Sequence, residues 1–364
     1  MYQVLIIQDV LKQYRVPLFT RLHDKLAAAD IQLTVAFARP DKNEQLKQDN
    51  CLEPPADFYR LIPVLRFGRI TLHRVSNLNQ YDLVIVEQAN RHLLNYWLLL
   101  RRRFSSRTRL AWWGHGFHHQ GQHYGWRDKL KSRLINKADW FFAYTAKVAE
   151  HVEQAGMPAG QVSALNNSID TYEFARQVAA LRQTGTQQSG TLLYCGALYE
   201  QKRLDLLLDT AERLFAQGIL QKLIVLGHGP LAHLMTPRAW LDYRGPCFGK
   251  DKARAYAEAA LVMNPGLTGL AILDAFAAGL PYITCDLPYH SPEIAYLEPN
   301  VNGQLVEPDA QALCDATAAL LMDKDRYTQQ CHNAYLSSEK YSIDAMVSKF
   351  AAGIQACLQP RNQP

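Results

Sequence analysis

Short apolar runs alternate with amphipathic stretches along almost the whole chain, and the alternation occurs in two series. Short apolar runs are typical of buried strands, and longer amphipathic stretches are typical of helices. Strands that alternate with helices predict βα units and parallel sheets. The expected strands are residues 3–8, 32–38, 83–87, 109–113, 140–144 and, more weakly, 162–166 in the first series, and 190–195, 222–226, 261–264 and 282–285 in the second. The chain is therefore predicted to be an α/β protein with two tandem domains.

A polar segment separates the two series. Residues 178–190 lose apolar content and end in Gly, Thr, Gln and Ser, a composition typical of a linker. We therefore expect a first domain over residues 1–177 and a second domain over residues 191–342. The C-terminal segment 343–364 carries a further helix, and we expect this helix to pack back on the first domain.

Composition excludes several classes of protein. A hydrophobic content of 48% is too high for a disordered chain. The seven cysteines are scattered and no C-x-x-C pair occurs, which argues against a disulfide scaffold and against a structural zinc site. The amino terminus reads as a strand rather than a signal peptide, and no apolar run approaches the ~20 residues of a membrane helix. We expect a cytoplasmic protein without a membrane span.

Positive charge is concentrated in the first half. Residues 1–177 contain 24 Lys and Arg against 16 Asp and Glu, whereas residues 178–364 contain 15 against 18. The basic residues gather in 60–74, 101–109 and 127–137, and aromatic residues lie among the first two groups. Such a surface suits an anionic membrane or a nucleic acid, or is an ordinary solvated surface. Because no nucleic-acid-binding motif is present, we expect the inner face of the cytoplasmic membrane as the partner and no nucleic acid.

Two loops of the second domain suit a phosphorylated ligand. In open α/β sheets, ligands bind at the carboxyl ends of the strands. Gly196 ends an expected strand, and Lys202 and Arg203 follow at the start of a helix, where a diphosphate would meet both cations and free N–H groups. A surface Lys-Arg pair is the simpler interpretation. The turn Gly227-His228-Gly229 allows close approach to a ligand but also occurs in ordinary turns.

Two further loops follow the next strands. The N–H groups of Gly269, Leu270 and Ala271 would face an anion at the start of an apolar helix. Asp274 lies one turn into this helix, where its carboxylate suits either the vicinal hydroxyls of a sugar or the helix dipole. The fourth loop, residues 290–293, reads as an ordinary polar turn.

The ordered set of these segments resembles a known family. GALYEQKRLDLLL, VLGHGPL, AYAEAALVMNPG, GLTGLAILDAFAAGLPYIT and PEIAYLEPNVNGQLV follow one another with the order and spacing of family 4 (group 1) glycosyltransferases of the GT-B fold. In the first half, residues 13–19 (QYRVPLF), 113–116 (WGHG), 138–140 and 165–170 are also similar to the family. The resemblance implies two Rossmann-like domains that face each other across a cleft.

The resemblance also implies a reaction. A sugar would pass, with retention of configuration, from a nucleoside diphosphate donor to a hydroxyl of a glycan or lipid-linked oligosaccharide. UDP is the expected nucleotide, and neither a metal nor another cofactor is expected. The second domain would bind the donor and the first would bind the acceptor.

The resemblance assigns roles residue by residue. His115 and Lys202 are the expected catalytic residues, and Tyr14, His115 and His118 are expected to bind the acceptor. The expected donor-binding residues are Arg15, Gly196, Lys202, Arg203, Gly227, His228, Gly229, Gly245, Phe248, Thr268, Gly269, Leu270 and Asp274. Gly245 and Phe248 would border the nucleobase.

Two positions depart from the family pattern. Ala197 stands where the family usually has Arg, so diphosphate charge would rest on Lys202, Arg203 or Arg15. Gly266 stands where the first of two acidic residues is usual, and Asp274 is the second. These departures leave a non-catalytic nucleotide-sugar-binding scaffold as an alternative. Another GT-B enzyme, such as an epimerase, is a further alternative.

Overall fold

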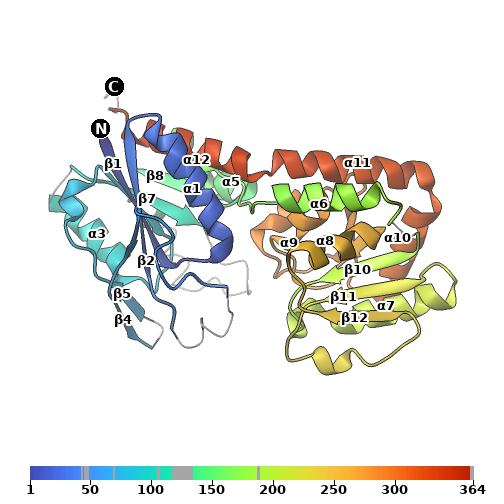
Figure 1. Cartoon of the computed structure of the whole chain (residues 1–364). Helices are drawn as coiled ribbons and strands as arrows, with labels where there is room; N and C mark the ends of the chain where they lie inside the picture. The colour runs from blue at the N-terminus through green and yellow to red at the C-terminus, as the bar shows by residue number, and fades with distance from the viewer. Residues whose placement is uncertain are drawn as a thin grey trace. The chain divides into compact units, whose positions relative to one another are not determined.

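A computed structural model describes the chain except residues 42–43, 45–48, 69, 105–106, 117–133, 187–188 and 361–364. The described chain forms two compact units (Figure 1). Unit 1 contains the described residues up to Asp170 together with the C-terminal segment from Ile343. Unit 2 contains Thr171–Ser342.

Unit 1 is built on a parallel sheet whose seven strands have the order β3-β2-β1-β6-β7-β8-β9. The strands are β1 (Tyr2–Val10), β2 (Ile31–Ala38), β3 (Tyr59–Leu61), β6 (Leu83–Glu87), β7 (Arg109–Gly114), β8 (Trp140–Ala143) and β9 (Val162–Ala164). Side chains of β1 alternate between two cores: Val4 and Ile6 face one, and Leu5 and Ile7 face the other. Burial on both faces explains why these strands read as continuous apolar runs.

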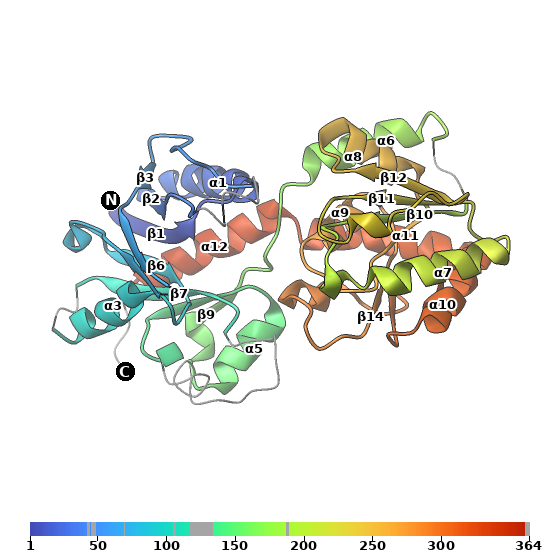
Figure 2. The ribbon, with the colours of Figure 1, turned by 90° about the horizontal axis from the view of Figure 1, so that it is seen from below.

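Helices cover both faces of this sheet. On one face lie α1 (Val16–Ala27) and α12 (Ile343–Leu358), which pack against each other (Figures 1 and 2). The ring of Phe350 in α12 contacts Trp113, with 5.1 Å between ring centroids, and Phe142, with 4.6 Å. On the other face lie α3 (Leu93–Phe104) and α5 (Ala146–Gln154). The antiparallel hairpin of β4 (Val64–Phe67) and β5 (Ile70–His73) packs beside α3.

Unit 2 is built on a parallel sheet whose six strands have the order β12-β11-β10-β13-β14-β15. The strands are β10 (Thr191–Cys195), β11 (Lys222–Leu226), β12 (Leu241–Gly245), β13 (Leu261–Met263), β14 (Tyr282–Cys285) and β15 (Gly303–Val306). One face packs against α7 (Leu204–Ala216) and α10 (Ala310–Met322). The remaining helices, α6 (Tyr172–Arg182), α8 (Gly249–Glu258), α9 (Ala271–Ala277) and α11 (Lys324–Lys340), form a second group of mutually packed helices (Figure 1).

The α/β class with two parallel sheets is confirmed, but the structure moves the expected boundary. Residues 178–182 of the expected linker belong to α6. Arg182 in this helix donates hydrogen bonds to the carbonyls of Ala278, at 2.6 Å, and Tyr256, at 3.3 Å, so α6 is held to unit 2. The boundary between the units therefore follows Asp170.

Other expectations concern single elements. The strands β3, β4, β5, β12 and β15 and the helix α11 were not predicted. The amphipathic pattern also predicts a helix at residues 126–137, which lie largely outside the described residues. None of the described helices has the length and apolar character needed to cross a membrane.

Candidate functional site

Lys202 lies at the point of the unit 2 sheet where the strand order reverses. The chain leaves β10 toward β11 on one side and returns to β13 on the other, and ligands of open α/β sheets bind at the carboxyl edge of this point. Lys202 ends the short helix η4 (Glu200–Lys202) after β10, and its ammonium donates a hydrogen bond to the carbonyl of Leu267 after β13. The side chain is buried, and this burial lowers the pKa of Lys202 to about 8.

The glycines of the first two loops are required by close packing. Gly227 has a φ of +132°, and a Cβ there would lie 1.9 Å from the carbonyl oxygen of Gly196. A Cβ at Gly229 would lie 2.4 Å from the carbonyl oxygen of Leu198. Only glycine allows the loops after β10 and β11 to touch in this way. Gly245 joins them, because its carbonyl accepts a hydrogen bond from the N–H of Gly227 at 2.8 Å.

Gly266 is also dictated by packing. A Cβ at this position would lie 2.2 Å from the carbonyl oxygen of Gln201 and 2.3 Å from the carbonyl carbon of Lys202. An acidic side chain therefore does not fit at residue 266 in this arrangement of the backbone. The close packing of the loop after β13 against Lys202 explains why residue 266 carries no carboxylate. The absence of this carboxylate does not indicate an inactive protein.

The third loop corrects one expectation. The N–H of Thr268 donates a hydrogen bond to Nδ1 of His290 at 2.9 Å, and Nε2 of His290 donates to the carbonyl of Cys285 at 2.8 Å. Burial lowers the pKa of His290, in keeping with a neutral ring in these roles. Thr268 therefore cannot offer its N–H to a donor substrate. Within the described part of the chain, no group accepts a hydrogen bond from the N–H of Gly269 or Leu270.

Asp274 is paired with a lysine that was not predicted as a site residue. Nζ of Lys252, in the first turn of α8, lies 2.7 Å from a carboxylate oxygen of Asp274 in α9. Burial opposes the charge of Lys252, but Asp274 raises the pKa of Lys252 above its ordinary value. The signal available in the sequence was the position of Lys252, close behind the loop that follows β12.

Cys195 shows that these groups converge. This cysteine ends β10, and burial raises the pKa of its thiol. The charges of Lys252 and Asp274 act on the thiol, and Cys195 in turn acts on Lys202. Lys202, Lys252 and Asp274 therefore all interact electrostatically with the residue that ends β10.

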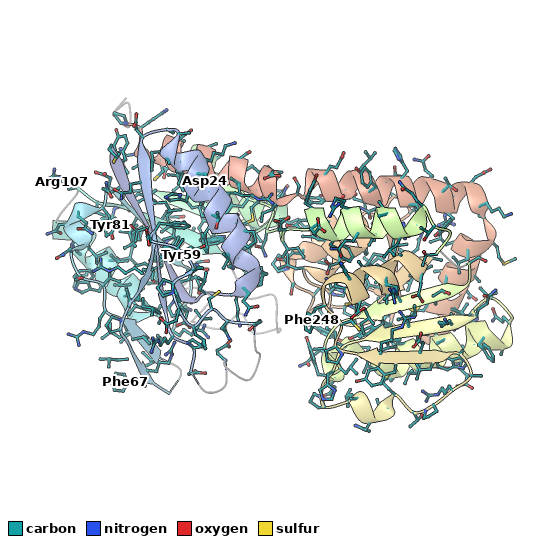
Figure 3. The ribbon with its side chains drawn as sticks, viewed as in Figure 1. Asp24, Tyr59, Phe67, Tyr81, Arg107 and Phe248 are labelled. Atoms are coloured by element: carbon teal, nitrogen blue, oxygen red, sulfur yellow. The ribbon has the colours of Figure 1, made fainter. Side chains whose placement is uncertain are left out.

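Three other expected donor-binding residues, Arg203, His228 and Phe248, differ in their contacts and exposure. Arg203 has a φ of +52° and pairs with Asp205 at 2.8 Å, so its charge is already neutralised. Nδ1 of His228 lies 3.5 Å from the hydroxyl of Tyr243. Phe248 precedes α8 with 80% of its surface exposed (Figure 3). Of the expected cations Lys202 and Arg203, Lys202 is therefore the one that remains to neutralise the charge of a bound diphosphate.

Arg15 and Tyr144 form a second cluster in unit 1. The buried guanidinium of Arg15 lies 4.4 Å from the ring centroid of Trp113 and donates hydrogen bonds to the hydroxyls of Tyr144, at 2.9 Å, and Tyr14, at 3.3 Å. Burial opposes the charge, but the two tyrosines and Glu87 raise the pKa of Arg15. Nη1 of Arg15 is buried and has no hydrogen-bond partner among the described residues.

His115 belongs to the same cluster. It follows β7 directly, its side chain is exposed, and its ring lies edge-on to Tyr144 with 4.1 Å between the ring centroids. Tyr144 follows β8 directly and was not predicted as a site residue. Burial raises the pKa of Tyr144 to about 12. Arg15, expected at the donor, thus lies beside the expected acceptor residues Tyr14 and His115. His118 lies outside the described residues.

The comparisons with known proteins match both units. The sequence model of Glycosyltransferase Family 4 matches residues 18–173, and the model of Glycosyl transferases group 1 matches residues 189–323. Among solved structures, Anabaena Alr3699/HepE in complex with UDP is 16% identical, with a TM-score of 0.66 over 98% of this chain and 100% of that chain. Sucrose-phosphate synthase from Thermosynechococcus elongatus is 16% identical, with a TM-score of 0.68 over 98% of each chain.

The solved structures show the GT-B fold, and the two sequence models that match the units are both glycosyltransferase models. The chain belongs to the family 4 (group 1) glycosyltransferases. A curated relative, the GDP-mannose-dependent alpha-(1-6)-phosphatidylinositol dimannoside mannosyltransferase of Mycobacterium tuberculosis, is 23% identical over 214 residues, or 56% of this chain. The chain spans about half the length of this relative, 55%.

Proposed function

We propose that this glycosyltransferase moves a sugar, with retention of configuration, from a nucleoside diphosphate sugar to a hydroxyl of a glycan or lipid-linked oligosaccharide in surface polysaccharide synthesis. The observation that carries the proposal is the position of Lys202 at the reversal point of the unit 2 sheet, together with the ion pair of Lys252 and Asp274. Two lysines and one carboxylate leave a net positive charge at the edge where such sheets bind ligands.

The donor diphosphate would bind beside Lys202. The ammonium is protonated below its pKa of about 8, and the N–H groups of Gly269 and Leu270 add donors on the neighbouring loop. Breaking the anomeric bond leaves negative charge on the diphosphate, and preorganised cations act most strongly where charge develops. In this proposal Lys202 stabilises the leaving group without a metal ion or another cofactor.

The nucleoside would occupy the neighbouring loops. Asp274 has one oxygen bound to Lys252, and its other oxygen would accept hydrogen bonds from the ribose hydroxyls. Exposed Phe248 and half-buried Gly245 would border the base. UDP is the proposed nucleotide, since the Anabaena structure is a complex with UDP, and GDP is the competing candidate from the name of the curated relative.

The acceptor hydroxyl would bind at the unit 1 cluster. His115 is exposed and lies against Tyr144, so it can contact a bound sugar while the buried tyrosine holds its ring. Arg15 retains one buried donor, Nη1, that can serve a bound oxygen. Tyr14 would complete this acceptor site.

We also propose that unit 1 attaches to the anionic inner face of the cytoplasmic membrane. Phe67 lies on the β4–β5 hairpin (Figure 3), and 65% of its surface is exposed. The neighbouring helix α3 exposes 47% of Trp97 and 59% of Leu100. Arg60 and Arg74, which flank the hairpin in sequence, are exposed as well. Apolar side chains beside arginines suit a bilayer surface with negative headgroups.

One experiment tests the catalytic proposal. Sugars linked to UDP, GDP, dTDP and CMP are screened for the rise in melting temperature that a ligand of the folded state produces. The best donor is then assayed for transfer to glycan and lipid-linked acceptors. Lys202→Ala should lower kcat/KM by about 100-fold or more, in the range for removing one preorganised electrostatic contact.

Lys250→Ala is the matched control, because Lys250 is exposed on the helix that carries Lys252. Equal activity of Lys202→Ala and Lys250→Ala would contradict the proposed role of Lys202. A product formed from donor alone, with no acceptor present, would favour an epimerase instead.

A further inference from the structure

Three side chains from distant parts of the sequence meet at the edge of the unit 1 sheet. Asp9 lies near the end of β1, His73 ends β5, and His92 follows β6. Nε2 of His73 lies 3.1 Å from one carboxylate oxygen of Asp9, and Nε2 of His92 lies 3.7 Å from the other. These ligand atoms all lie within 4.8 Å of one another. We propose that Asp9, His73 and His92 bind a divalent first-row transition metal of the zinc type.

The spacing of the three groups suits such an ion. Zinc bonds of about 2.0–2.1 Å in a tetrahedron place the ligand atoms roughly 3.3 Å apart. Two of the separations in the cluster, 3.1 and 3.7 Å, lie on either side of this value. Two imidazoles and one carboxylate form a ligand set of zinc sites and of related transition metals, whereas magnesium and calcium prefer oxygen ligands. Three protein ligands leave one position open for a water or another oxygen ligand.

The surrounding structure holds the ligands in place. Both histidines are buried, and their rings contact each other edge-on with 4.9 Å between the centroids. The N–H of Thr71 donates a hydrogen bond to the carbonyl of Arg91 at 2.9 Å, and Thr71 forms a β-bridge with His92. Thr71 therefore fixes the β5 strand to the loop after β6 close to the cluster.

Arg91 occupies the lone pair that His92 would offer to a metal. Nε2 of His92 accepts a hydrogen bond from Nε of Arg91 at 3.3 Å. A metal would take this lone pair in place of Arg91, so the Arg91 side chain has to move when the metal binds.

Two arginines compete with the metal for Asp9. Nη2 of Arg91 lies 3.1 Å from the carboxylate, and Nη2 of Arg66 lies 3.5 Å from it. The Arg91 side chain is 57% exposed and can leave the carboxylate at little cost, and the Arg66 contact is long. Removing Arg91 should therefore tighten metal binding. If the cluster were held only by ion pairs and bound no metal, the same change would only remove one contact.

The cluster lies at the edge of the unit 1 sheet where ligand binding is expected. β1 and β6 are the neighbours at which the strand order of this sheet reverses, so the cluster lies at the ligand-binding edge of unit 1. Local spacing in the sequence predicts no metal site here, because residues 9, 73 and 92 are too far apart to form a spacing motif. The proposal depends on this cluster alone and not on the proposed donor or acceptor.

The test measures metal binding to the full chain. After treatment with a chelator, the protein is titrated with Zn²⁺ in equilibrium dialysis, and Co²⁺ is used as a spectroscopic probe of the ligand set. We expect one Zn²⁺ per chain, at least tenfold weaker binding in Asp9→Asn and His92→Gln, and tighter binding in Arg91→Gln. Circular dichroism in the presence of chelator establishes that each variant is folded.

Two controls separate this site from other histidines. Combined substitution of His118, His119 and His123 by Ala removes a histidine-rich stretch of the sequence, and His332→Ala removes an exposed histidine of α11. Both variants should bind Zn²⁺ as the wild type does. Failure of the wild type to bind, unchanged binding in Asp9→Asn and His92→Gln, or loss of binding in the triple variant would overturn the proposal.

Discussion

Gly266 illustrates how a single residue can be misjudged from the sequence. Beside the family pattern it appears as the loss of an acidic residue, but in the structure a Cβ at this position would clash with the backbone of Gln201 and Lys202. This contact positions Lys202, because it fixes the short helix η4, whose last residue is Lys202. Such a backbone contact between loops has no signature in composition or periodicity.

Substitution of Gly266 should therefore cost stability. Gly266→Ala forces the loops after β10 and β13 apart, and overpacking of this kind typically costs roughly 1–3 kcal/mol. Urea denaturation measures the loss in the free energy of unfolding. Gly160→Ala is the control, since a Cβ there meets no atom within 4 Å. Equal stability of the two variants would show that the loop relaxes without cost.

The lowered pKa of Lys202 predicts a pH dependence of donor binding. The ammonium loses its charge as the pH rises through about 8, so affinity for the diphosphate should fall above that pH. The folded-state pKa lies below the ordinary value, so the unfolded chain binds the extra proton between about 8 and 10.5. Burial of Lys202 therefore costs stability below pH 8, and this cost is relieved as the pH rises.

Lys202→Arg provides the comparison, because a guanidinium stays charged over this range. Isothermal titration with the preferred donor from pH 6.5 to 9.5 should show a decline above pH 8 in the wild type and none in this variant. A decline of equal size in both proteins would assign the pH effect to another group.

At the scale of the element, the β4–β5 hairpin and α3 form the exposed apolar surface of unit 1. The hairpin was not predicted, because its strands of four residues have one face on α3 and the other in solvent, so they carry no long apolar run. The central strands were predicted correctly, since both of their faces are buried and the signal is strong. For the same reason α6 was misjudged: a helix with a single fully buried residue, Val178, resembles a linker in composition.

The hairpin surface predicts a lipid dependence. Phe67→Ser combined with Trp97→Ser should reduce co-sedimentation with phosphatidylglycerol vesicles several-fold, because both side chains are about half exposed or more. Tyr172→Ser is the matched control, with 74% of its surface exposed in unit 2. Equal binding of the wild type to anionic and neutral vesicles would refute the membrane proposal.

At the scale of the whole molecule, the final helix completes a core made by the first residues of the chain. Met346, Phe350 and Ile354 of α12 are buried against the same face of the sheet as Leu18 and Phe19 of α1. The sequence could suggest this packing, since α12 follows a complete second unit and is apolar. It could not suggest which partners it meets, because the contacts of Phe350 with Trp113 and Phe142 join residues more than 200 positions apart.

Phe350→Ala should destabilise unit 1 strongly. Truncating a fully buried phenylalanine costs about 3–5 kcal/mol of unfolding free energy. The fluorescence of Trp113, whose ring centroid lies 5.1 Å from that of Phe350, should report the earlier transition in urea. Tyr335→Ala on α11, where the side chain is 48% exposed, should leave this transition nearly unchanged. A similar shift in both variants would contradict the central place of α12 in this core.

The position of α12 also bears on synthesis. A ribosome completes residues 1–170 long before it makes residues 343–358, so the earlier part emerges with one face of its sheet lacking a helix. Unit 2, which is continuous from Thr171 to Ser342, can close before the final helix is made. The part of the enzyme translated first is therefore finished last, and until then its uncovered apolar surface is a natural substrate for a chaperone.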